Sequence, residues 1–392
     1  MQVGHRESPS PGLRLVSITA SNAVASTPVP ARCARSRGVG DSATLAAMGD
    51  ASRAVETIYH DYLTGLILTT VTRRDPVSAA ELVFRTFRRQ HLEKFLPGLE
   101  KLGLTGLPHA VACARYHYLS NQLGGVRVQY MEESPRKAWV RYVPPRWIYP
   151  GATICAVPSV VTRAILRGWH AHNGVTLGNA RLGFVCTKMT TDGHPGLEGY
   201  YLEHDRELEP DERLRFAPDE EAPDFDATRA PRLPSATWPP DRRRKVARNY
   251  TMDYVRSILP ELVAVFGSDE ARRLGGITGR LVGMQDWAST AEELAIAGDS
   301  AQDFADYLQR LGEAQGDRIG WHADGPDVVI RQTTWRLMDG VFAVPDGVFE
   351  SWNALWEGAL SVHNRRLTLA VTKRLDRGDG VFEWRLQRRQ KA

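Results

Sequence analysis

The stretch that decides the fold is GWHAHNGVTLGNARLGFVCTKMTTDG, from Gly168 to Gly193, because a similar phrase returns much later in the chain. The second phrase is EGALSVHNRRLTLAVTKRLDRGDG, from Glu357 to Gly380. Both contain His-Asn, then an alternating apolar run typical of a strand, then Thr-Lys and a turn closed by glycine. A chain that repeats such a phrase is expected to contain two related modules.

Several shorter matches surround the two phrases and occur in the same order in each half of the chain. The matched positions are FLPGLEKLG from Phe95 with FADYLQRLG from Phe304, Trp147 with Trp335, His172-Asn173 with His363-Asn364, Leu182, Phe184, Thr187 and Lys188 with Leu367, Leu369, Thr372 and Lys373, and Tyr200 and Tyr201 with Phe382 and Trp384. Their shared order favours an internal duplication.

The patterns between the matches predict an α+β fold. Helical spacing runs over 52–123, and hairpin patterns follow over 126–142 and 181–205. Ser289 and Ser300 are each expected to begin a helix, because an acid follows three residues later. We therefore predict two pseudo-symmetric modules, each made of helices plus an antiparallel sheet, from an internal duplication.

The expected domain limits follow from changes in composition. They are a disordered N-terminal extension over 1–51, a first α+β module over 52–216, a Pro-rich acidic linker over 217–240 and a second α+β module over 241–388. Met48 begins a helical pattern and is an alternative start of translation to Met1.

Composition excludes several classes of protein. The 392 residues carry 50 basic and 46 acidic side chains, a net charge of +4, which is too balanced for a nucleic-acid-binding surface. No apolar run approaches the ~20 residues of a membrane span. The four cysteines form no C-x-x-C pair, so we expect a reduced, cytoplasmic protein. Whether it is a homo-oligomer is left open.

The first module holds most of the titratable candidates for a site. His172 is a candidate general base, although His172-Asn173 also fits a helix C-terminus. Cys186 lies on a predicted strand, either as a buried inert thiol or as a nucleophile activated by His172. Cys155 is a second candidate thiol. His170 and His172 are two residues apart and cannot share one helix face, so no metal site is predicted.

The segment YYLEHDRELEPDER, from Tyr200 to Arg213, supplies the remaining candidates. On a strand, Tyr201, Glu203 and Asp205 share one face. Glu203 is a candidate acid or base, and Tyr201, Asp205, Arg206 and Asn173 are candidate substrate-binding residues. A salt-bridged surface explains the same charges equally well.

Motifs for common cofactors are missing from the sequence: it has no P-loop, dinucleotide-binding glycine turn, G-x-S-x-G or H-E-x-x-H. We therefore expect a protein without a cofactor whose partner is a small-molecule substrate or ligand. The second module has Val371 where the first has Cys186, so the site is expected in the first module.

The ending NRRLTLAVTKRLDRGDGVFEWRL resembles two related α+β families, the L-2-amino-thiazoline-4-carboxylic acid hydrolase-like family and the 4-vinyl-reductase-like small-molecule-binding domain. Gly378-Asp379 forms the turn, Trp384 is the aromatic of the last strand, and Phe382 stands where those families have cysteine. The resemblance implies a cofactor-independent hydrolase acting on a C–N bond of a small, heterocyclic substrate, or alternatively a non-catalytic small-molecule-binding or sensor protein.

Overall fold

The computed structural model describes residues 42–146, 148–341 and 343–389, with side chains from Ala51 onward. Most of the predicted extension over 1–51 and Trp147 lie outside the described residues. The first helix begins at Ser42, before the expected start at residue 52. The fold is α+β, with helices and two separate sheets, as predicted. No helix in the described part of the chain is long and apolar enough to cross a membrane.

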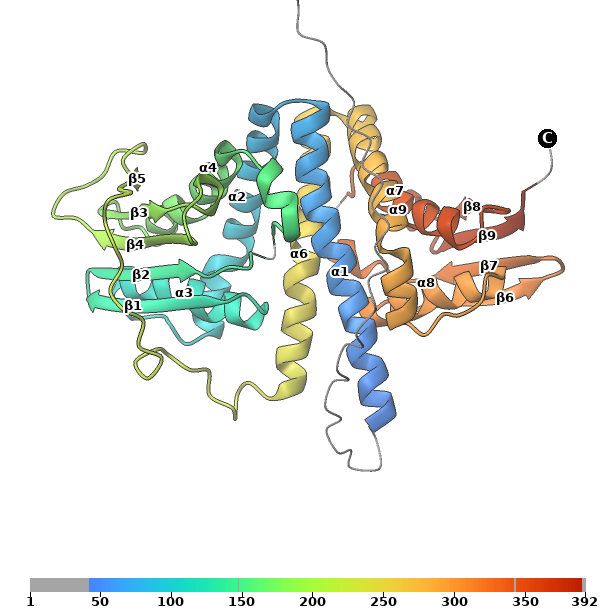
Figure 1. Cartoon of the computed structure of the whole chain (residues 1–392), viewed down its shortest axis with the longest axis horizontal. Coiled ribbons are helices and arrows are strands. Elements are labelled where there is room, and N and C mark those ends of the chain that lie inside the picture. Colours follow the sequence, from blue (N-terminus) through green and yellow to red (C-terminus); the bar gives the residue numbers. More distant parts are fainter. Residues whose placement is uncertain (1–41, 147, 342, 390–392) are drawn as a thin grey trace, which may run out of the picture. The chain divides into compact units, whose positions relative to one another are not determined.

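Four long helices stand between the two sheets (Figure 1). They are α1 (Ser42–Arg73), α2 (Pro76–Lys101), α6 (Pro240–Phe266) and α7 (Ser268–Glu293). Asp75 caps α2 by accepting hydrogen bonds from the amides of Val77 and Ser78, and Pro76 fits its first turn. The apolar faces of these helices form a single core that includes both halves of the chain. Residues 43–392 accordingly form one compact unit, and the division at 217–240 stays a prediction.

The first sheet carries its strands in the order β1-β2-β4-β3-β5, with β5 parallel to β3 and the other pairs antiparallel, so it is mixed and not antiparallel throughout as predicted. Its elements are α3 (His109–Leu123), β1 (Val128–Ser134), β2 (Lys137–Tyr142), α4 (Ser159–Gly168), α5 (Asn173–Thr176), β3 (Leu182–Lys188), β4 (Leu197–Glu203) and β5 (Leu214–Phe216). Helix α3 packs on β1, β2 and β4. The predicted hairpins over 126–142 and 181–205 are confirmed.

The second sheet has the order β6-β7-β9-β8, which matches the first sheet without β5. Its elements are α8 (Ala301–Gln315), β6 (Ile319–Asp324), β7 (Asp327–Gln332), α9 (Val348–His363), β8 (Leu367–Lys373) and β9 (Phe382–Arg388). Ser300 caps α8 through a capping box with Asp303, as predicted. The predicted cap at Ser289 is wrong, because Ser289 lies inside α7.

Details of the strands agree between the two sheets. A bulge lies between Cys186 and Lys188 in β3, and another between Val371 and Lys373 in β8. Before each of these strands an asparagine side chain accepts a hydrogen bond from the amide two residues later, over 3.0 Å at Asn179 and 2.9 Å at Asn364.

These details correct two of the sequence matches. Asn364 stands in the position of Asn179, so its match with Asn173 is wrong. Val371 pairs with Trp384 as Cys186 pairs with Gly199, so Trp384 does not take the place of a tyrosine. Two-letter matches do not fix register, and a shift of one residue turns a side chain to the other face of the sheet.

The third corrected match concerns helices. Phe95 lies in α2, whereas Phe304 lies in α8, which precedes its sheet as α3 precedes the first. His172-Asn173, which also fitted a helix C-terminus, does not end α4, because α4 ends at Gly168. A Cβ there would lie 2.8 Å from the carbonyl oxygen of Phe84, so this turn needs glycine to approach α2.

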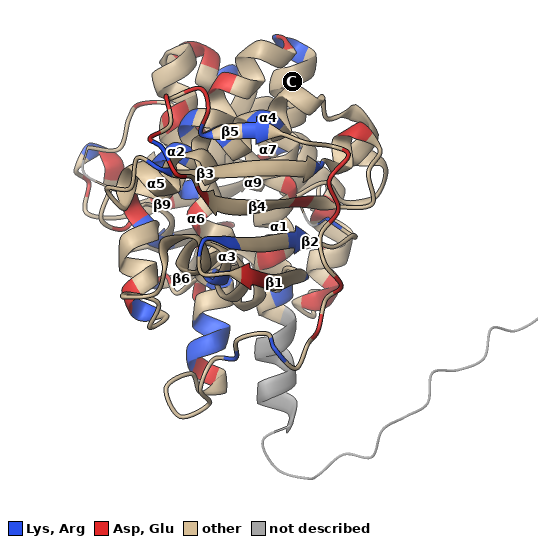
Figure 2. Ribbon diagram, turned by 90° about the vertical axis from the view of Figure 1, so that its left-hand side faces the viewer, with Lys and Arg blue, Asp and Glu red and all other residues tan. Residues whose placement is uncertain are grey.

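The predicted linker partly covers the outer face of the first sheet (Figure 2). That face carries the buried apolar side chains Met131, Trp139, Val185 and Tyr200. Residues Ala217, Ala222 and Phe225 of the linker pack against them. Near the end of the linker, Trp238 is 3% exposed and lies 5.5 Å from the Lys101 amine of α2.

Candidate functional site

A cavity of about 350 Å³ lies between α2, α3 and α6, in the first half of the chain. Aromatic side chains supply much of its wall. They are Phe87, Tyr116, Tyr142, Trp169, Trp238, Tyr250 and Tyr254. Cavities of this volume with apolar walls and few polar groups are typical of small-molecule sites.

Two glycines make room for two of these rings. A Cβ on Gly98 of α2 would lie 2.5 Å from the Tyr116 ring, and one on Gly124 would lie 2.5 Å from the Tyr250 ring. Neither position tolerates a larger side chain unless the ring moves. The Tyr116 and Tyr250 rings can therefore take these positions because Gly98 and Gly124 have no side chain.

At the cavity, five buried side chains among the described residues are joined by a continuous chain of hydrogen bonds. The amide nitrogen Nδ2 of Asn173 lies 3.5 Å from Nε2 of His117, whose Nδ1 lies 2.9 Å from the Tyr142 hydroxyl. The same hydroxyl lies 3.2 Å from Nε2 of His170. The two imidazole rings stack at 4.2 Å, and Tyr201 accepts from Asn173 over 3.1 Å.

The donors along this chain follow from its first member. With Asn173 donating to Nε2 of His117, the proton of His117 is on Nδ1 and is donated to Tyr142. Tyr142 then donates to Nε2 of His170. The remaining proton of His170 is on Nδ1, a buried atom with no hydrogen-bond partner among the described residues.

Burial sets the charge of these groups. It lowers the pKa of His117 well below its usual range, and the neighbouring His170 lowers it further. Burial, then His91 and Arg146, lower the pKa of His170 to about 3. Burial raises the pKa of the Tyr142 hydroxyl. The site therefore holds neutral imidazoles and neutral phenols at neutral pH.

Four charged side chains line the cavity: Lys94, Lys101, Arg146 and Asp253. Lys94 and Asp253 form an ion pair of 3.0 Å. The Lys101 amine lies 5.5 Å from the ring of Trp238, and the Arg146 guanidinium lies 5.1 Å from that of Tyr142.

The structure brings together two of the predicted site residues, Asn173 and Tyr201. Both are fully buried in the hydrogen-bonded chain. His172 lies outside it, with its ring 5.2 Å from that of His91, and does not line the cavity. Burial, then Arg88 and Arg213, lower the pKa of His172 to about 4.

Cys186 lies in the core of the first sheet, where it is 2% exposed. Its thiol donates to the carbonyl oxygen of Lys188 over 3.5 Å. Burial raises its pKa to about 12, which keeps the thiol protonated and disfavours a nucleophilic role. Cys155, the other candidate thiol, is exposed in the turn before α4.

The carboxylates lie together at the far end of β4 and away from the cavity lining. Glu203 accepts from Asn179 over 3.2 Å and lies 3.6 Å from Arg181. Asp205 is paired with Arg136 at 2.8 Å, and Arg206 with Glu212 at 2.5 Å. Both Asp205 and Arg206 are mainly exposed, which is typical of a salt-bridged surface.

Three central residues of this region were missed from the sequence. His117 lies in the helical run ARYHYLSNQ, Tyr142 ends a strand, and Arg146 follows the Pro144-Pro145 pair. Tyr142 and Arg146 are signalled by the concentration of aromatic and basic residues in RYVPPRW, whereas His117 lies in an ordinary helical pattern. That pattern does not reveal that α3 and β2 bring them together.

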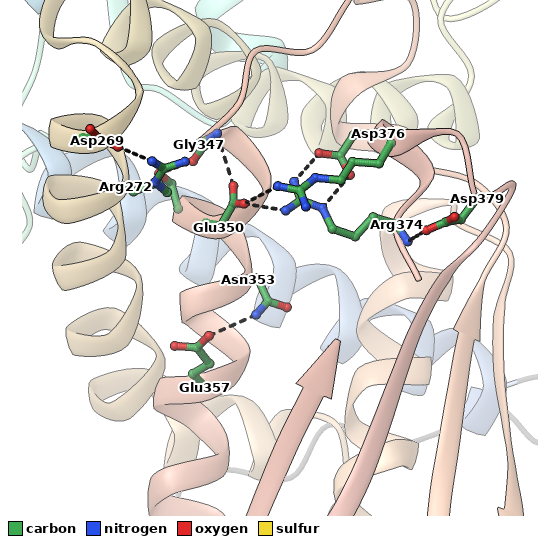
Figure 3. A network of polar contacts seen from close by, with 11 residues as sticks. Asp269, Arg272, Gly347, Glu350, Asn353, Glu357, Arg374, Asp376 and Asp379 are labelled. Carbon is green, nitrogen blue, oxygen red and sulfur yellow. Dashed lines mark hydrogen bonds and ion pairs between the residues drawn. The ribbon is translucent and has the colours of Figure 1, made fainter. Parts of the chain in front are cut away.

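The second half of the chain has a polar cluster of another kind, at the end of β8 (Figure 3). Arg374 forms ion pairs with Glu350 of α9 and with Asp376, and its amide donates to Asp379 over 2.7 Å. Burial alone would lower the pKa of Arg374. The hydrogen bonds to Asp376 and Glu350 nevertheless hold this pKa above its usual value. This buried arginine is fully compensated.

Comparisons of this chain with protein-family models, curated proteins and solved structures find no match. Among the described residues, no group of three or more His, Cys, Asp or Glu side chains is placed to hold a metal ion. Only the geometry therefore bears on function.

Proposed function

We propose that this chain binds a small molecule in the cavity between α2, α3 and α6. The observation that carries the proposal is the cavity itself, walled by aromatic rings and bordered by the hydrogen-bonded chain of His117, Tyr142 and His170. Apolar walls provide affinity, and a few fixed polar groups provide orientation. This corresponds to the binding-protein alternative expected from the sequence.

Native mass spectrometry of the purified protein tests this proposal. Val246 lines the cavity, so Val246→Trp should fill part of it, whereas the same change at the 73% exposed Val77 should not. A molecule retained by wild type and by Val77→Trp but lost from Val246→Trp is the expected result. Equal retention by all three proteins would place the ligand elsewhere.

A cofactor-independent hydrolase acting on a C–N bond is the second candidate. It is favoured by the neutral imidazole of His170, which lines the cavity and whose Nδ1 has no partner among the described residues. Nδ1 can accept a proton from an attacking water only in the opposite tautomer, in which Nε2 of His170 donates to the Tyr142 hydroxyl, Tyr142 donates to Nδ1 of His117, and the 3.5 Å bond from Asn173 to His117 is given up. In this reading His170 is the base in place of His172, and Cys186 takes no part.

Incorporation of ¹⁸O from labelled water into the carbonyl product tests the hydrolase. The substrates would be a panel of cyclic amidines and amides. His170→Gln should abolish incorporation, while His172→Gln should retain it. If only His172→Gln lost ¹⁸O incorporation, the base would be His172, as predicted from the sequence.

We also infer that the two sheets and their helices are pseudo-symmetric modules from an internal duplication. The shared strand order, the two bulges and the paired roles of Asn179 and Asn364 support it. Superposition of the two sheets in an experimental structure, guided by the bulges, tests it. A cytoplasmic location and a homo-oligomer stay proposals, the latter testable by light scattering.

A further inference from the structure

The charges around the cavity do not cancel. The ion pair with Asp253 compensates Lys94. Lys101 is exposed, so water solvates its charge at the rim. Arg146 is only partly exposed, and its guanidinium forms no hydrogen bond or ion pair with the described residues.

The surroundings of Arg146 are aromatic. Its guanidinium stacks over the Tyr142 ring, and its other electrostatic neighbours are Tyr149, Tyr250 and Tyr254. Its Nε is buried and has no hydrogen-bond partner among the described residues. Two other arginines that are not exposed are paired with carboxylates: Arg141 with Glu198, and Arg374 with Glu350 and Asp376.

A half-buried guanidinium without an anion is costly unless something else supplies the negative charge. Its planar fork matches the two oxygens of a carboxylate or sulfonate. The rings of Tyr116, Trp169 and Tyr250 offer flat apolar surfaces in the same cavity.

We propose that the cavity selects an aromatic monoanion, with its anionic group on Arg146 and its ring system among the aromatic walls. This rests on the proposed small-molecule function and names the class of ligand. One negative charge suffices, because among the described residues Arg146 is the one lining cation that is neither paired with a carboxylate nor exposed.

Isothermal titration calorimetry with three probes of one shape tests the proposal. Naphthalene-2-carboxylate and naphthalene-2-sulfonate carry one negative charge, and naphthalene-2-carboxamide is neutral. Wild type should bind both anions more tightly than the amide. Arg146→Met should weaken the anions by about 10- to 100-fold, the range of a charge-assisted hydrogen bond, and leave the amide unchanged.

Two variants serve as controls. Arg127→Met removes an exposed arginine near the same strands that does not line the cavity, and should bind like wild type. Arg146→Lys keeps the charge but loses the planar fork, and should retain part of the preference for anions. It also tests the idea if Arg146→Met fails to fold. Without ligand, Arg146→Met should melt at or above the temperature of wild type.

The outcomes separate this inference from the proposed function. Equal binding of anions and amide, unaffected by Arg146→Met, would overturn the anion preference and leave the cavity as a binding site. If none of the three probes bound, the proposal that the cavity selects an aromatic monoanion would be wrong. If in addition Val246→Trp left every retained molecule in place, the proposed function would fail as well.

Discussion

Replacement of Asp286 should stabilise the protein at neutral and alkaline pH. Asp286 lies on α7 and is 6% exposed, and its carboxyl group shares a hydrogen bond with Asp61 on α1. Burial, then the charge of Asp61, raise the pKa of Asp286 from its ordinary 3.8 to about 7. The folded protein therefore keeps a proton that the unfolded chain releases.

The sign and size of the effect follow from that shift. A raised carboxyl pKa gives stability that is complete below the unfolded value and is lost as pH rises through the folded value. At about 1.4 kcal/mol per pKa unit, the displacement from 3.8 to about 7 corresponds to a loss of ~4 kcal/mol above neutrality. Asp286→Asn removes this loss and still donates to Asp61, so we expect it to gain about 2–4 kcal/mol near pH 8 and almost nothing near pH 4.

Urea denaturation of wild type and Asp286→Asn across this pH range measures the difference. Subtraction removes the titration of groups common to both proteins. Asp61→Asn should give a smaller gain, because burial of Asp286 remains. A difference in unfolding free energy that is flat with pH would refute the shared proton.

Three further changes follow from packing. Gly283→Ala should lower the free energy of unfolding by about 2–4 kcal/mol in denaturation, because its Cβ would lie 2.1 Å from the carbonyl oxygen of Leu355 on α9. Gly276→Ala on the same helix should be neutral or stabilising, because its Cβ would lie 3.4 Å from the end of the Arg280 side chain. Cys186→Val should cost only about 1 kcal/mol and leave ligand binding intact, since the thiol is buried away from the cavity, and lost binding would restore Cys186 to the site. Trp238→Ala should cost more binding free energy than unfolding free energy, because it removes part of the cavity wall. An unchanged affinity would show that Trp238 does not contact the ligand.

The elements could largely be predicted from the sequence, because alternation and helical spacing are local. Their register and relationships could not. The pairing of Val371 with Trp384 depends on a bulge, and the match of Asn364 with Asn179 depends on a turn, neither of which a two-letter match reveals.

The candidate site shows the same limit. Asn173 and Tyr201 were found because they lie near the repeated phrase, and the structure joins them. His117 and Arg146 lie in segments with ordinary helix and turn patterns, and only packing of α3 against β2 places them at one cavity. The conspicuous charges of Glu203, Asp205 and Arg206 proved to be in surface ion pairs.

The most direct test of the central claim is a crystal structure of the protein with naphthalene-2-carboxylate bound. We expect density between α2, α3 and α6, with the carboxylate on Arg146 and the rings beside Tyr116 and Tyr250. An empty cavity with the compound bound at another place would contradict it.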